Sequence, residues 1–105
     1  MSQISTITQQ LHIPIDSISL LCQRYQVSEL ALFGSILRQD FRDDSDIDVL
    51  VEFKPEAQIG FLALSRMQRE LSALFRRPVD LVPKAGLKPK IRQEVLSTMQ
   101  VLYAS

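Results

Sequence analysis

The hydrophobic residues of this chain recur with a helical period in three segments. Pro89 opens the weakest of them, which predicts a helix over residues 89–98. A second stripe follows Asp16 and predicts a helix over residues 16–26, with apolar positions at Ile18, Leu21, Cys22 and Tyr25. The clearest stripe predicts a helix over residues 60–76 with arginines on its opposite side, and its apolar positions are Leu64, Met67, Leu71, Leu74 and Phe75.

Short apolar runs between these helices predict three buried strands. They cover residues 30–33, 46–53 and 79–82, and turn-forming or helix-breaking residues follow each of them. We also expect a short helix over residues 36–41 and an apolar tail at residues 101–103. Helices interleaved with strands predict an α/β fold: a single small domain with a short mixed sheet of about three strands packed with helices.

The length of 105 residues suits one domain. We expect an N-terminal arm over residues 1–13, whose order the sequence leaves open, and a domain over residues 14–105. No apolar run approaches the roughly 20 residues of a membrane span, and no basic-then-apolar leader opens the chain, so we expect a cytoplasmic protein without a membrane partner. A single cysteine and a single histidine exclude an internal disulfide and a structural zinc site.

The charges balance overall but are unevenly distributed. Twelve basic and twelve acidic residues cancel, which removes the general positive field of a nucleic-acid binder, and we expect no direct nucleic-acid binding. Residues 40–56 are acidic, whereas residues 57–92 are basic. Within the basic part, Lys84, Lys88, Lys90 and Arg92 suit an acidic partner surface, nucleotide phosphates or a solvated helix face.

Two aspartates at alternate positions of the second predicted strand are the first candidate for chemistry. Asp46 and Asp48 project from the same side of a strand, where two carboxylates 4 Å apart repel by about 4 kcal/mol at an effective dielectric near 20. Divalent cations would neutralise that repulsion, as in two-metal phosphoryl transfer. An exposed acidic loop is the alternative. A calcium-binding EF-hand is excluded, since Val49 and Pro55 stand where its loop needs glycine and glutamate.

Two further features of the sequence suit the binding of a phosphate or a metal ion. Gly34-Ser35 ends the first predicted strand, where a backbone without a Cβ and the first N–H groups of a helix can approach a phosphate, although most such dipeptides are simply turns. Asp80 interrupts an apolar strand, where a carboxylate is costly unless it faces a cleft, a partner or a metal. A loop or capping role is the alternative for Asp80.

These three features together resemble a known superfamily. Gly34-Ser35, ten intervening residues and Asp46-Ile47-Asp48 are similar to the Gly-Ser-x10-Asp-x-Asp signature of the polymerase β-like nucleotidyltransferases. With Val79-Asp80-Leu81-Val82 added, the chain resembles the minimal nucleotidyltransferase (MNT) antitoxins, which are paired with helical HEPN-domain toxins. The resemblance extends from about Pro14 to Leu102, and it implies the polymerase β-like nucleotidyltransferase fold.

The resemblance also implies an activity and a set of site residues. Asp46, Asp48 and Asp80 would be the catalytic carboxylates and the ligands of two Mg²⁺ ions. Gly34, Ser35 and Arg38 would bind the nucleoside triphosphate, although Leu37 and Gln39 replace the small residues that often flank this arginine in the family. The chain would transfer AMP from ATP to a tyrosine of its HEPN toxin.

Two other functions stay open at this point. One is a non-catalytic antitoxin that neutralises the toxin by forming a complex with it. The other is transfer to a small molecule such as an aminoglycoside, which the lack of room for a substrate-binding domain disfavours.

Overall fold

The computed structural model describes residues 13–37 and 46–105. The elements are α2 (Ile15–Arg24), β1 (Val27–Phe33), η1 (Gly34–Leu37), β2 (Ile47–Phe53), α3 (Phe61–Phe75), β3 (Val79–Pro83), η2 (Lys84–Gly86), α4 (Pro89–Thr98) and β4 (Gln100–Ala104). Helices and strands are interleaved along the described chain, and the 3₁₀ turn η1 stands between the consecutive strands β1 and β2, while a second 3₁₀ turn, η2, follows β3. No helix within the described ranges has the length and apolar character needed to cross a membrane.

The strands form one mixed sheet in the order β3-β2-β1-β4. Strand β1 pairs antiparallel with both β2 and β4, whereas β2 and β3 run parallel. The expected small α/β domain with a mixed sheet is confirmed, and the sheet has four strands where we expected about three. The fourth is β4, which covers the segment taken from the sequence as an apolar tail and forms one edge of the sheet.

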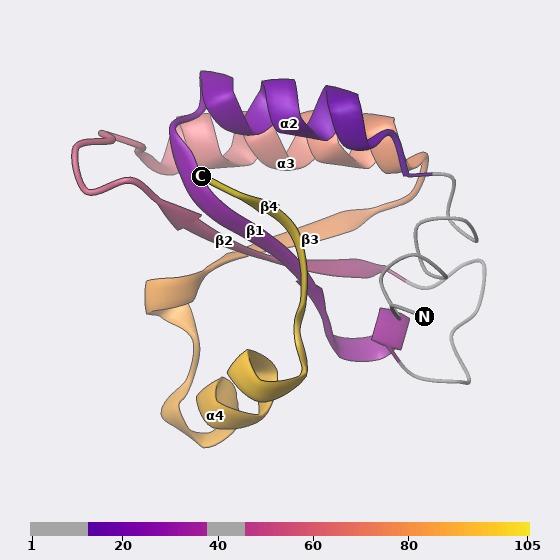
Figure 1. Ribbon diagram of the computed structural model, residues 1–105, viewed down its shortest axis with the longest axis vertical. Coiled ribbons are helices and arrows are strands. Elements are labelled where there is room, and N and C mark those ends of the chain that lie inside the picture. The colour runs from indigo at the N-terminus through magenta and orange to yellow at the C-terminus, as the bar shows by residue number, and fades with distance from the viewer. Residues whose placement is uncertain (1–12, 38–45) are drawn as a thin grey trace.

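Helices cover both faces of the sheet (Figure 1). Helices α2 and α3 lie side by side on one face, and α4 lies on the other. Alternation along β2 divides its side chains between two cores: Val49 packs in the α2/α3 core, whereas Leu50 packs with Val95 of α4. Ile13, the last residue of the expected arm, is 7% exposed and also packs in the α2/α3 core. Residues 1–12 lie outside the described part.

Left-handed residues explain where two helices end. We expected these helices to extend to residues 26 and 76, but they end at Arg24 and Phe75. Gln26 and Arg76 each have a φ of 58°, which no α-helical residue adopts. Of the short helix expected over residues 36–41, η1 covers 34–37 and residues 38–41 are outside the described ranges. Strand β1 begins three residues earlier than expected, because Val27 and Glu29 pair with β2 and Glu29 also pairs with β4. Ser28 lies at a register irregularity between them, and its hydroxyl donates to the Glu52 carbonyl.

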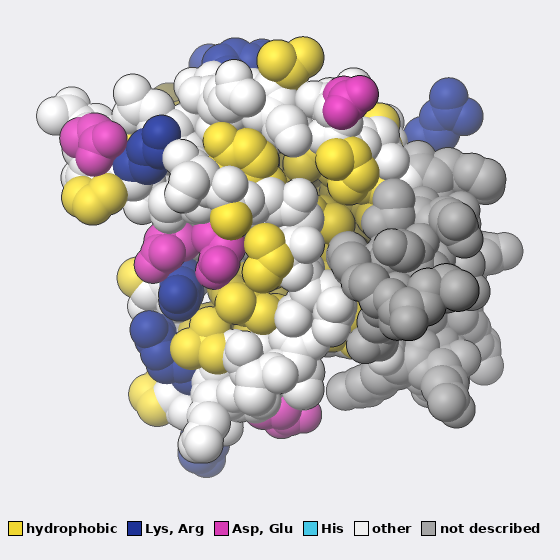
Figure 2. Space-filling view, viewed as in Figure 1, with side chains coloured by type: hydrophobic (Ala, Val, Ile, Leu, Met, Phe, Trp, Pro, Cys, Tyr) yellow, Lys and Arg dark blue, Asp and Glu magenta, His cyan; other side chains and the backbone are white. Residues whose placement is uncertain are grey.

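Hydrophobic side chains run through the middle of the face seen in Figure 2, between the helix layer at the top and α4 at the bottom. Acidic and basic side chains gather at the left of this face. An ion pair of 3.6 Å between Glu52 of β2 and Lys84 of η2 joins the ends of β2 and β3.

Candidate functional site

The register of the parallel pair brings two of the predicted aspartates together. Asp48 of β2 and Asp80 of β3 are direct partners, so their Cα atoms lie on neighbouring strands that are spaced about 4.8 Å apart. The residues on either side of Asp80, Val79 and Leu81, are buried in the α2/α3 core. Both carboxylates therefore emerge on the opposite face, which α4 partly covers. Asp48 is half-buried and Asp80 is exposed.

Gly34 lies directly against the Asp48 carboxylate. It follows Phe33, the β1 residue that pairs with Asp48, and has a φ of +77°. A Cβ built on Gly34 would lie 2.3 Å from Oδ2 of Asp48 and 3.1 Å from its Cγ. Both the backbone conformation and this close approach require glycine here. From the sequence we expected Gly34 to leave room for a ligand; the structure shows that it leaves room for the carboxylate itself.

Asp46 lies at the start of the same strand. It is exposed and immediately precedes β2, two residues before Asp48. The next residue, Ile47, donates its N–H to the carbonyl of Pro78 at 2.9 Å. The backbone pairing of β2 with the β3 segment therefore extends to the residue after Asp46. Asp48 and Asp80 thus come from two adjacent strands, and Asp46 comes from the residue immediately before the first of these strands.

The described carboxylates do not form a ready-made group of metal ligands. Within residues 13–37 and 46–105, no three His, Cys, Asp or Glu side chains are grouped so that they could hold a metal ion. The donor type still suits Mg²⁺, which prefers oxygen ligands and binds through one or two carboxylates together with substrate phosphates. The residues therefore fit the ion by their chemistry and by their placement on neighbouring strands.

The other predicted nucleotide contacts are only partly described. Ser35 lies in η1, directly after Gly34. Arg38 lies outside the described residues. Two of the predicted basic residues lie away from the aspartates. Lys84 follows the last residue of β3 and pairs with Glu52, which is four residues along β2 from Asp48 and so about 13 Å away. Arg92 lies beside Lys84 and donates to its carbonyl.

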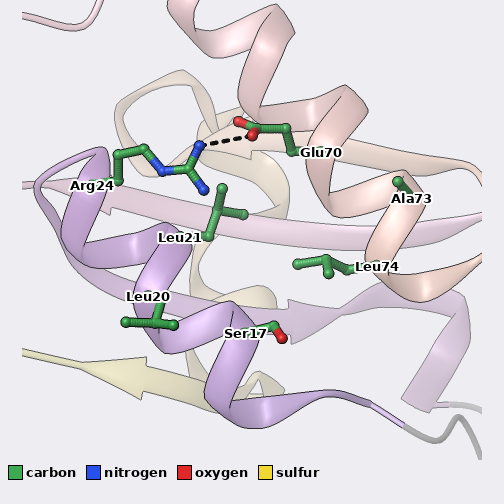
Figure 3. A pocket seen from close by; sticks show the side chains of 7 residues that line it. All are labelled: Ser17, Leu20, Leu21, Arg24, Glu70, Ala73 and Leu74. Atoms are coloured by element: carbon green, nitrogen blue, oxygen red, sulfur yellow. Dashed lines mark hydrogen bonds and ion pairs between the residues drawn. The ribbon is translucent and has the colours of Figure 1, made fainter.

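A groove of about 400 Å³ between α2 and α3 forms a second feature (Figure 3). Arg24 of α2 and Glu70 of α3 close one end of it with an ion pair of 2.9 Å. The Tyr25 hydroxyl also donates a hydrogen bond to Glu70. This hydrogen bond, with the charge of Arg24, lowers the pKa of Glu70, while burial and the same hydrogen bond raise the pKa of Tyr25.

The sequence placed Tyr25 in the apolar stripe of its helix and gave no sign of its contact with Glu70, because the two residues are 45 positions apart. The groove lies in the helix layer on the other side of the sheet from Asp48 and Asp80.

Comparisons with known proteins identify the family of this chain. The family model described as a nucleotidyltransferase domain matches residues 17–102. The protein adenylyltransferase MntA of Thermococcus cleftensis is 39% identical over 83 residues, which cover 79% of this chain and 80% of that protein. A solved structure of a candidate minimal nucleotidyltransferase is 31% identical, with a TM-score of 0.70, over 89% of this chain and 91% of the other.

A more distant structure has the same fold. It contains a tri-AMPylated HEPN toxin of Shewanella oneidensis in complex with its MNT antitoxin. The matched chain is 20% identical, with a TM-score of 0.65, over 90% of this chain and 73% of the other. The chain therefore belongs to the nucleotidyltransferase domain family, in its minimal nucleotidyltransferase group, and is an enzyme of the adenylyltransferase type.

Proposed function

We propose that this chain is the antitoxin of a HEPN/MNT pair and transfers AMP from ATP to a tyrosine of its HEPN toxin. The observation that carries the proposal is the pairing of Asp48 with Asp80 on one face of the sheet, with Gly34 packed against Asp48. The name of the Thermococcus cleftensis relative supports a protein as the acceptor, and the AMPylated HEPN toxin in the more distant complex supports the partner.

Each site residue has a proposed role. Asp46, Asp48 and Asp80 would hold two Mg²⁺ ions, which when bound neutralise charge on the triphosphate and favour in-line displacement. Gly34, Ser35 and Arg38 would bind the triphosphate. The tyrosine oxygen attacks the α-phosphorus of ATP, the bond from that phosphorus to the β-phosphate oxygen breaks, and pyrophosphate leaves. Asp80, the more exposed residue of the pair, would accept the phenolic proton.

Transfer of labelled AMP tests this proposal. The full chain, Mg²⁺, labelled ATP and the HEPN toxin proposed as its partner are incubated together, and label on the toxin is measured. We expect Asp48→Asn to reduce transfer at least 100-fold. Glu52→Gln is the matched control, because it changes an acid on the same strand whose side chain pairs with Lys84. Label that survives Asp48→Asn would contradict the mechanism.

The second candidate is neutralisation by binding alone. The absence of a closed ligand set in the described residues is the observation that favours it. If it is correct, a chain carrying Asp46→Asn and Asp48→Asn protects cells from the toxin as well as the unchanged chain does. Our proposal expects this double variant to bind the toxin but to leave it unmodified and active.

A further inference from the structure

Among the residues that the structure describes, strand β3, which carries Asp80, lies at an edge of the sheet with β2 as its one neighbouring strand. In a parallel pair, successive residues direct their backbone N–H groups alternately toward the neighbour and away from it. Val79 and Leu81 donate their N–H groups to side chains of α3, which shows that these two groups point away from β2. An edge of this kind is otherwise free to move or to accept another strand.

Two side chains of α3 bind these outward N–H groups. Leu81 donates its N–H to Oε1 of Gln68 at 2.9 Å, and Val79 donates its N–H to Oγ of Ser72 at 3.0 Å. Gln68 and Ser72 are four residues apart, so they lie on the same side of the helix. Both side chains are half-buried beside β3.

The Ser72 hydroxyl is oriented by a bond of its own. It donates to the backbone carbonyl of Gln68 at 2.9 Å, so its proton is directed away from β3 and a lone pair remains for the Val79 N–H. The two contacts therefore hold the backbone immediately before and immediately after Asp80. Pairing with β2 holds Asp80 itself from the other side.

We propose that Gln68 and Ser72 are positioning residues for Asp80. Their contacts fix the backbone of β3 on both sides of Asp80. They thereby fix the position of the Asp80 carboxylate relative to Asp48. A displacement of about 1 Å in a reacting group can reduce the rate about 100-fold, so two bonds to the flanking residues are sufficient to affect catalysis. The inference rests on the proposed role of Asp80 in nucleotidyl transfer.

Substitutions that remove the acceptor atoms test the inference in the full chain with its HEPN protein. Gln68→Leu keeps the size of the side chain but loses Oε1, and Gln68→Glu keeps an oxygen acceptor. We expect Gln68→Leu to lower kcat at least ten-fold with the KM values for ATP and toxin within two-fold, and Gln68→Glu to restore most of the rate. The amide of Leu81 should exchange with solvent faster in Gln68→Leu than in the unchanged chain.

Ser72→Ala has a matched control on another helix. Ser97 of α4 makes the same kind of bond to its own helix, from Oγ to the Glu94 carbonyl at 3.0 Å. We expect Ser72→Ala to lower kcat at least five-fold and Ser97→Ala to leave it unchanged. Thermal unfolding of each variant confirms that the assays are made on folded protein.

A double-mutant cycle separates positioning from general stabilisation. If Gln68 acts through Asp80, then Gln68→Leu has no further effect on the residual transfer of Asp80→Asn. A Gln68→Leu chain that is less stable but keeps kcat within two-fold would overturn the inference, and so would additive losses in the cycle. Loss of transfer in Asp80→Asn combined with normal rates in Gln68→Leu would overturn the inference alone. Unchanged transfer in Asp80→Asn would overturn the role of Asp80 and the inference together.

Discussion

At the scale of single residues, the contact between Gly34 and Asp48 is the most restrictive in the candidate site. A side chain at Gly34 would have to overlap the Asp48 carboxylate, and the left-handed backbone disfavours every residue that carries a Cβ. The glycine of this motif is thus required by the protein itself, before any nucleotide is bound. Its neighbour Ile36 is buried in the α2/α3 core, so η1 has little freedom to move away.

We predict that Gly34→Ala destabilises the fold by at least 1 to 2 kcal/mol, the cost of a left-handed non-glycine residue, and abolishes transfer. Urea unfolding and the AMP-transfer assay measure the two effects. Gly60→Ala is the matched control, because a Cβ at Gly60 would have no neighbour within 4 Å. Adding Asp48→Ala to Gly34→Ala should recover part of the stability but none of the transfer. Equal stability of Gly34→Ala and Gly60→Ala would contradict the prediction.

At the scale of elements, α2 and α3 are joined across their groove by Tyr25, Glu70 and Arg24 (Figure 3). This connection matters for the site because α3 also carries Gln68 and Ser72, which hold the strand of Asp80. A shift of α3 relative to the sheet would therefore move the edge of the candidate site.

The lowered pKa of Glu70 predicts how pH affects this connection. Because the pKa is lower in the folded chain than its ordinary value near 4.5, the unfolded chain binds more protons as the pH falls. The contribution of Glu70 to stability is present above about pH 4.5 and is lost as the pH falls below it.

We expect the loss of stability between pH 7 and pH 3.5, measured by urea unfolding, to be smaller in Glu70→Gln than in the unchanged chain. Tyr25→Phe removes only the hydroxyl that is the main cause of the shift, and it should reduce the same loss. Identical acid profiles for all three proteins would show that the connection contributes nothing.

At the scale of the whole molecule, the sheet separates two faces with different properties. The α2/α3 layer and its core cover one face (Figure 1). Asp48 and Asp80 emerge on the other face, near the first residues of β2 and β3, whereas the Glu52–Lys84 ion pair lies where these strands end. Nucleotide binding would therefore act on the side of the sheet that has the smaller core, formed around Leu50 and Val95.

Binding of Mg²⁺ and ATP should stabilise the whole molecule. A ligand at 100 times its dissociation constant adds about 2.7 kcal/mol to the free energy of unfolding. We predict a rise in melting temperature with Mg²⁺ and ATP together and a much smaller rise with ATP and EDTA. Asp48→Asn should lose most of the shift and Glu52→Gln should keep it. An equal shift in the two variants would mean that the nucleotide binds elsewhere.

Much of the fold was predictable from local pattern. The helical stripes, the three apolar strands and the single α/β domain follow from periodicities over a few residues, and side-chain packing in the structure agrees with them. Strand β4 was not predictable, because Gln100–Ala104 has too short and irregular a pattern and becomes a strand only by pairing with β1. The ends of α2 and α3 depend on left-handed residues that carry no glycine signal.

The candidate site was also predictable only in part. The sequence by itself determined which residues have the chemistry: alternating aspartates in a strand, a glycine at a strand end and an aspartate in an apolar run. Only the tertiary structure decided that Asp48 and Asp80 are register partners, that Gly34 abuts Asp48, and that Gln68 and Ser72 hold β3. Local periodicity depends on near neighbours, whereas register and edge contacts join residues far apart in the chain, and only packing of the complete sheet and helices selects them.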